Sequence, residues 1–143
     1  MADPMEKILT NAASGMSAQS IRMNTIASNL ANAGSIGSSE STTYHAKFPI
    51  FSEVTHNIPG LNSADQPVGG VRVTQISQSK KPLEHRYDPS NPLADKDGFI
   101  YATDVNPIVE MTNMIAASKD YEANTTVIKT TENLLVQSID SLK

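Results

Sequence analysis

The residues that could do chemistry are few and scattered. The three histidines, His45, His56 and His85, lie in a proline-rich middle segment without the regular spacing of metal ligands. We therefore expect structural or solvated histidines and no metal site. The chain has no cysteine, which excludes disulfides, thiolate zinc sites and cysteine nucleophiles.

The segment Asp95–Gly98 (DKDG) is similar to half of a calcium-binding loop. Placing Gly98 at the sixth loop position puts Leu93 at the first and Asp104 at the twelfth. The first ligand and the usual bidentate glutamate are then both missing. The segment instead predicts a tight turn into a strand at 99–101. We find no catalytic constellation and expect neither an enzyme nor a cofactor.

The composition also limits what the chain can do. Its 143 residues suit one domain, and 15 acidic against 11 basic side chains give a formal charge of −4. That balance argues against a nucleic-acid-binding face. Only 5% of residues are aromatic, so we expect a small core whose burial is completed by contacts outside the monomer. No apolar run approaches the ~20 residues needed to cross a bilayer, so we expect no membrane-spanning segment. We also expect no cleaved signal peptide, since Asp3 and Glu6 stand where positive charge is expected.

A long helix is predicted from Asp3 to Ala33, with Asp3 as N-cap and Pro4 at the first helical position. Apolar residues repeat there with strict seven-residue spacing, interrupted only by the polar Gln19. The two interleaved sets are Leu9, Met16, Met23 and Leu30, and Met5, Ala12, Gln19, Ile26 and Ala33. This spacing is typical of a coiled-coil seam, although an amphipathic helix packed on its own domain remains the alternative.

A second long helix is predicted from Asn106-Pro107 to about Leu142, again with a cap followed by proline. Its seven-residue set is Met114, Tyr121, Ile128, Leu135 and Leu142, and the stripe is widened by Met111, Ala117, Val127, Leu134 and Ile139. Two seamed helices at opposite ends of one chain favour an antiparallel pairing of the termini.

The middle of the chain predicts a small β-rich lobe. A Ser/Gly/Thr-rich loop at 35–43 is followed by short strand-like runs at 44–54, 70–76, 83–87 and 99–101. The predicted fold class is therefore α+β, with a coiled-coil-like hairpin of terminal helices and a small β-rich lobe. The expected parts are an N-terminal helix at 1–34, the lobe at 35–105 with a flexible loop at 35–43, and a C-terminal helix at 106–143, the two helices forming one inner domain.

Two terminal motifs resemble the signatures of one family. The segment 28–33 (SNLANA), with 22–24 (RMN) before it, resembles the N-terminal signature of bacterial flagellar axial proteins, which include rod, hook and hook-associated proteins. The segments 113–118 (NMIAAS) and 121–124 (YEAN) resemble their C-terminal signature. The motif residues that we single out are Ser28, Asn29, Leu30, Ala31, Asn32, Tyr121, Glu122, Ala123 and Asn124.

The middle narrows the resemblance to proximal-rod subunits, through the segment 87–95 (YDPSNPLAD) with Asp97-Gly98 and Val105-Asn106. The chain departs from the family pattern at 35–39 (SIGSS), which stands where a Thr-x-Gly-Tyr-type segment is common.

The resemblance implies a structural, self-assembling subunit of the rod in the flagellar basal body. In this family the paired terminal helices form the inner layer of a tube, which transmits torque across the periplasm and encloses the export channel. The implied partners are further copies of the chain, other rod subunits, the junction of the rod base with the membrane ring, and the type III export apparatus, which takes subunits without a cleaved signal.

The seam is the predicted site of assembly, through burial against helices of the same or neighbouring chains. It comprises Leu9, Met16, Met23, Ile26, Leu30, Met114, Tyr121, Ile128 and Leu135. The amides of Asn29, Asn32 and Asn124 are either solvated or fix the register between helices. The alternative function is a helical export chaperone or adaptor, which would stay a discrete soluble oligomer. A small hydrolase has no supporting constellation.

Overall fold

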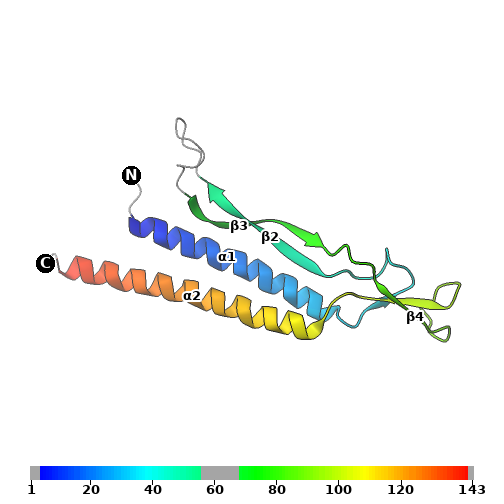
Figure 1. The fold of residues 1–143 in the computed structure, drawn as a ribbon. Helices are drawn as coiled ribbons and strands as arrows, with labels where there is room; N and C mark the ends of the chain where they lie inside the picture. Colours follow the sequence, from blue (N-terminus) through cyan, green and yellow to red (C-terminus); the bar gives the residue numbers. More distant parts are fainter. Residues whose placement is uncertain (1–3, 56–67, 142–143) are drawn as a thin grey trace. The chain divides into compact units, whose positions relative to one another are not determined.

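The computed structural model describes residues 4–55 and 68–141. The elements in chain order are α1 (Pro4–Ala31), β1 (Ile36–Gly37), β2 (Lys47–Thr55), β3 (Val68–Gln78), β4 (Glu84–Tyr87), β5 (Phe99–Ala102) and α2 (Pro107–Asp140) (Figure 1). One long helix precedes the short strands in the chain and the other follows them, which confirms the predicted α+β class. Within the described residues, neither helix is long and apolar enough to cross a membrane.

Both helices begin with proline, as predicted. At α2 the side-chain Oδ1 of Asn106 accepts hydrogen bonds from the N–H groups of Ile108 and Val109, at 3.0 and 3.3 Å. These bonds satisfy N–H groups that have no partner inside the helix, and Pro107 has no N–H to satisfy. The predicted N-cap of α1, Asp3, lies outside the described residues.

The three-stranded sheet has the order β1-β5-β4 and is antiparallel throughout, while β2 and β3 form a separate two-stranded sheet. Four strands lie where the sequence predicts them. Strand β1 was missed, because the sequence predicted only a loop at 35–43. Ile36 and Gly37 pair with Ala102 and Tyr101 of β5, so this two-residue strand is specified by its partner and not by a pattern of its own.

The chain divides into two compact units, and each combines helix with strand. The first comprises Met1–Ile21, Ile50–Gln75 and Ala116–Lys143, and the second comprises Arg22–Pro49 and Ile76–Ile115. Each unit therefore holds a segment of α1 beside a segment of α2 (Figure 1). The predicted division into parts 1–34, 35–105 and 106–143 follows the elements instead, and it stays a prediction.

The core is small, as the low aromatic content predicts. Among the described residues, the buried apolar side chains of the first unit are the alanines Ala12, Ala18 and Ala117, and those of the second are Ile26, Leu83, Ile100 and Val105. Gly15 of α1 lies against Asn124 of α2, where an added Cβ would stand 3.0 Å from the side-chain amide. The helices of the first unit thus meet through small side chains that allow a close approach.

Candidate functional site

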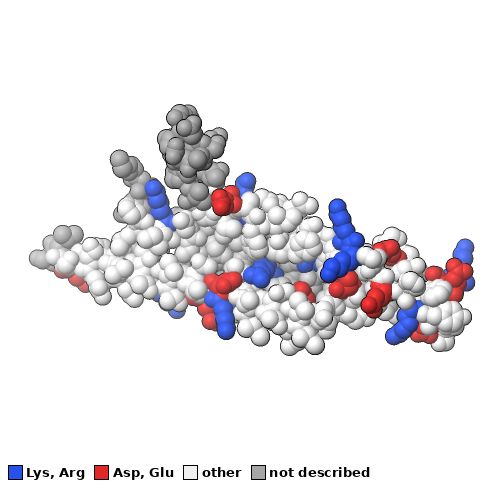
Figure 2. Space-filling view, viewed as in Figure 1, with Lys and Arg blue, Asp and Glu red and all other residues white. Residues whose placement is uncertain are grey.

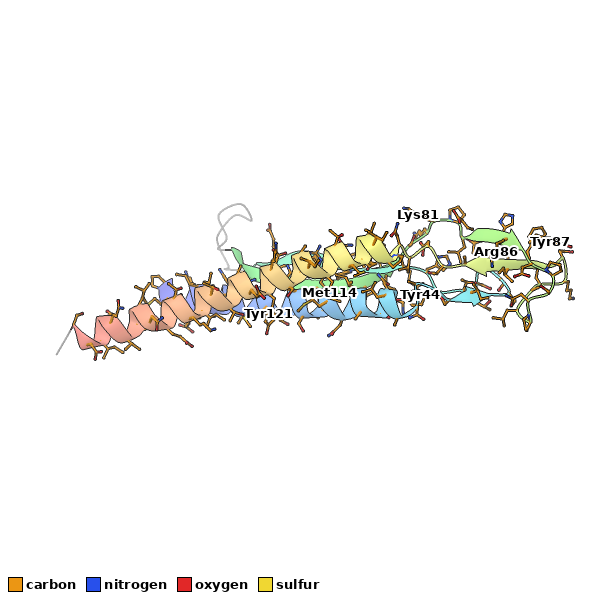
Figure 3. All side chains as sticks on the ribbon, turned by 90° about the horizontal axis from the view of Figure 1, so that it is seen from below. Tyr44, Lys81, Arg86, Tyr87, Met114 and Tyr121 are labelled. Atoms are coloured by element: carbon orange, nitrogen blue, oxygen red, sulfur yellow. The ribbon has the colours of Figure 1, made fainter. Side chains whose placement is uncertain are left out.

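The predicted seam residues all lie on the less exposed sides of their helices. Ile26 is buried, and the other eight seam residues are half-buried, with Met114 and Tyr121 labelled on α2 in Figure 3. In the first unit the hydroxyl of Thr125 lies 3.9 Å from Sδ of Met16. The role of these residues in assembly stays a prediction.

Four of the five residues that were predicted to widen the α2 stripe are not covered within the single chain. Ala117 is buried, but Met111, Val127, Leu134 and Ile139 are exposed. Two helices that pair with each other bury a narrow seam at seven-residue spacing, whereas a broad stripe requires a wider packing surface. The exposed positions are therefore apolar residues without a covering layer in this chain.

An exposed apolar patch marks the start of α2 in the second unit. Ile108, Met111 and Ile115 are 75%, 59% and 59% exposed, and their spacing of three and four residues puts them on one helical face. We call these three residues the α2 outer patch. Much of the visible surface of the two helices in Figure 2 is uncharged. Contiguous exposed apolar side chains indicate a contact surface.

Asn29 is the best-connected polar side chain of the second unit and is only 1% exposed. Its Nδ2 donates to the carbonyl of Lys47 at 2.7 Å and to Oε2 of Glu110 at 2.8 Å. Its Oδ1 accepts from the Lys47 N–H and the Tyr44 hydroxyl, both at 2.9 Å. Both donor positions and both acceptor positions of the amide are therefore used.

This cluster joins three segments that are far apart in the sequence. Asn29 lies on α1 and Glu110 lies on α2. Lys47 is the first residue of β2, and Tyr44 lies just before it. Because Tyr44 donates to Asn29, the contact of Ser28 Oγ with the Tyr44 hydroxyl at 3.1 Å is a bond donated by Ser28. The Asn29 amide can form all these bonds in only one orientation, so it fixes the position of α1 relative to the other two segments.

The other two asparagines that the sequence singled out behave differently. Asn32 follows the last residue of α1 and donates back to the carbonyl of Ser28 at 2.8 Å. Asn124 donates to the carbonyl of Asp120 at 2.9 Å, within α2. Of the three amides, only Asn29 makes a hydrogen bond from one helix to the other. Gln19, the polar seam residue, donates to Oδ2 of Asp120 at 3.2 Å and so links the helices in the first unit.

The remaining motif residues divide between the interface and the surface. Leu30 and Tyr121 are half-buried, whereas Ala31, Glu122 and Ala123 are exposed. No pattern in the sequence indicates the partners of Asn29. Tyr44, Lys47 and Glu110 belong to no recognisable motif, and two of the bonds involve the Lys47 backbone, which carries no residue-specific signal.

The turn predicted before β5 is present. Oδ1 of Asp95 accepts from the N–H groups of Asp97 and Phe99, and the Gly98 N–H donates to the Asp95 carbonyl at 3.1 Å. Gly98 has a positive φ of 83°, which favours glycine. The carboxylate of Asp95 thus holds its own turn, so the turn interpretation of the DKDG segment is confirmed.

Of the three histidines, His45 precedes β2 and His85 lies in β4, while His56 lies outside the described residues. Within 4–55 and 68–141 no three metal-ligating side chains cluster. Burial raises the pKa of the Asp104 carboxyl. Hydrogen bonds from Ser79 and from the backbone N–H groups of Ala46 and Asp104, with the charge of His45, outweigh that effect and hold the pKa below its ordinary value.

Comparison with known proteins agrees with these features. Residues 9–34 match the family described as "Flagella basal body rod protein", and residues 96–141 match "Flagellar basal body rod FlgEFG protein C-terminal". The flagellar basal-body rod protein FlgC of Buchnera aphidicola from Schizaphis graminum is 41% identical over 92% of this chain and 93% of the relative. The FlgC protein of Salmonella typhimurium is 37% identical over 90% of each chain, and that of Agrobacterium fabrum is 32% identical over 99% of this chain and 97% of the relative.

These relatives span nearly the whole chain, including both helices, the Asn29 cluster and the turn before β5. The resemblance inferred from the terminal motifs and the middle segment is therefore confirmed, and the chain belongs to the family of flagellar basal-body rod proteins FlgC.

Proposed function

We propose that this chain is a structural subunit of the bacterial flagellar basal-body rod and assembles through its paired terminal helices into the wall of the rod. The observation that carries the proposal is the match to rod proteins along nearly the full length of both chains. Members of this family are structural proteins, so the chain is not an enzyme. The alternative of an export chaperone has no support among these relatives.

The helices supply two different surfaces for this role. The seam residues, from Leu9 to Leu30 on α1 and from Met114 to Leu135 on α2, pair the helices with each other. The α2 outer patch is exposed beside that seam and is available to a neighbouring subunit. Burying an apolar side chain of this size contributes about 1.5–3 kcal/mol, so three such residues give a useful contact in each repeat of an assembly.

The wider role follows from the place of rod proteins in the flagellum. We propose that the assembled subunits form a tube within the periplasm, which encloses the export channel and transmits torque. The partners would be further copies of this chain, other rod subunits, the junction with the membrane ring, and the type III apparatus that exports the subunit.

The experiment is a single charge introduced into the α2 outer patch. Ile115→Asp changes an exposed position, so the subunit should fold and be exported normally, but its carboxylate would be buried at the subunit contact. We expect loss of motility and absence of the subunit from purified basal bodies, although the protein level in the cell remains normal.

Thr126→Asp is the matched control. Thr126 lies 11 residues, about three helical turns, after Ile115, so it is on the same face of α2, at an exposed polar position. We expect cells that carry Thr126→Asp to swim normally. If Ile115→Asp cells also swim normally, the α2 outer patch does not take part in assembly. If the subunit is missing from basal bodies of motile cells that carry the unchanged chain, it is not a rod component at all.

A further inference from the structure

Strand β4 is an edge strand of the three-stranded sheet, and all four of its residues are exposed. Its register against β5 pairs Glu84 with Ala102 and Tyr87 with Phe99. The next pair in this register is Asp88 with Gly98, and the Asp88 N–H donates to the Gly98 carbonyl at 2.8 Å. Because hydrogen-bonded pairs alternate along antiparallel strands, the backbone groups of Glu84 and Arg86 face β5.

The pairing of β5 with β1 gives the same result for which backbone groups of β4 face β5. The Thr103 N–H donates to the Ser35 carbonyl at 3.3 Å, so odd-numbered residues of β5 face β1 and even-numbered residues face β4. The N–H and C=O groups of His85 and Tyr87 therefore point to the outer edge of β4. An edge of this kind can pair with another strand.

The side chains of β4 differ between its two faces. On one face, His85 and Tyr87 continue an aromatic row across the sheet. The centre of the His85 ring lies 5.5 Å from that of the Phe99 ring, and the centre of the Tyr87 ring lies 5.3 Å from it. On the other face, Glu84 and Arg86 carry opposite charges two residues apart. Arg86 and Tyr87 are labelled in Figure 3.

We propose that the unassembled subunit pairs with a second copy of itself through this edge, antiparallel, with His85 opposite His85 of the second copy. In that register Glu84 lies opposite Arg86 of the second copy, and Arg86 lies opposite the second copy's Glu84. Both charge pairs are then complementary. The outward backbone groups of His85 make this a hydrogen-bonded pair, which is the geometry that the outer edge requires.

The neighbouring register is unfavourable, because shifting the pairing by two residues puts Arg86 opposite Arg86 of the second copy. A shift by one residue would place the aromatic and charged faces against each other. Of these registers, only the one centred on His85 pairs opposite charges and keeps like faces together. Arg86 also contacts Asp88 at 3.8 Å, but the Arg86 side chain is 75% exposed and its guanidinium can take a second carboxylate.

Such a pair differs from rod assembly. A two-fold contact uses the same surface on both copies and stops at two, whereas assembly into a tube is open-ended. Four residues on each side bury much less than the ~1,200 Å² of a stable interface, so we expect a weak, concentration-dependent dimer. The pairing would cover the exposed strand edge of the free subunit, and it does not depend on the proposed function.

Engineered cysteines test the register directly, because the chain has no cysteine of its own. In the proposed dimer the two copies of His85→Cys have Cα atoms about 5.5 Å apart, within disulfide range. Two copies of Glu84→Cys are offset by two residues on opposite strands, about 8 Å apart and out of range. The purified full chain, oxidised under identical conditions, should form disulfide dimers several-fold faster with His85→Cys than with Glu84→Cys.

Charge reversal tests the same contact without cysteine. Glu84→Arg replaces two attractive pairs by repulsive ones and should weaken the dimer about tenfold in sedimentation equilibrium. Adding Arg86→Glu in the same chain reverses both charges and should restore it. Equal cross-linking at positions 84 and 85, or a double variant no better than Glu84→Arg, would overturn the proposal. Both experiments use the free subunit, so rod assembly does not affect either result.

Discussion

Replacing Asn29 by aspartate is the sharpest test of how the helices are held in the second unit. The change keeps the shape of the side chain, so it creates no cavity. It removes both N–H donors, leaving the Lys47 carbonyl without its bond. It also places an oxygen where Nδ2 now lies, 2.8 Å from Oε2 of Glu110.

The cost follows from these two lost bonds. A buried carbonyl left without a partner costs about 1–3 kcal/mol, and losing a hydrogen bond to a charged group costs about 1.5–3 kcal/mol. Together the two losses should destabilise the Asn29→Asp variant by about 2.5–6 kcal/mol, before any repulsion between the two carboxylates is counted. A domain of this size is stable by about 5–15 kcal/mol, so the variant should be markedly unfolded at moderate urea concentrations.

The assay is urea unfolding followed by circular dichroism at 222 nm. Asn32→Ala is the control, because the Asn32 side chain bonds back to the nearby Ser28 carbonyl of α1 and not to a distant segment, so its removal should cost less than about 1 kcal/mol. Adding Glu110→Gln to Asn29→Asp removes the facing charge and supplies a donor, so it should recover part of the loss.

The pH dependence has a definite sign. Burial and the facing carboxylate of Glu110 raise the folded-state pKa of the introduced group above its unfolded value, so its destabilising effect grows as pH rises above about 4 and shrinks in acid. If Asn29→Asp unfolds within about 0.5 kcal/mol of the parent at pH 7, the hydrogen-bonded cluster does not hold the helices as inferred.

Three further changes test other parts of the chain. Gly98→Val should destabilise the β4–β5 hairpin by about 2–4 kcal/mol in thermal unfolding, because its φ is positive and a Cβ would lie 2.9 Å from the Tyr87 ring; His85→Gln should cost little. Asp104→Asn should lower stability at pH 7, where the carboxylate accepts from Ala46, and the difference from the parent should shrink as pH falls below about 4 through the lowered pKa; a constant difference would contradict this assignment. Ile128→Asp should abolish motility while the subunit is still exported, because it puts a charge into the seam, and normal swimming would show that the seam is misplaced.

Local patterns in the sequence were enough to place both helices and most of the sheet. The Asn106-Pro107 cap predicts the start of α2, and seven-residue spacing predicts which face of each helix is less exposed. Aspartate followed by glycine predicts the turn at Gly98. Each of these features depends on residues close together in the chain, where backbone geometry and hydrogen bonding restrict the options.

Other features were decided only by contacts between distant segments. Strand β1 has two residues and exists because β5 offers it a partner. The exposure of Met111 depends on what packs over α2, which periodicity does not specify. Asn29 looked like one of three equivalent asparagines, yet it alone bonds from one helix to the other, because its partners are brought to it from about 20 and 80 residues away along the chain. The spacing of residues in the sequence thus determines which faces are apolar, but only the fold decides which of them are covered and which buried amide finds all its partners.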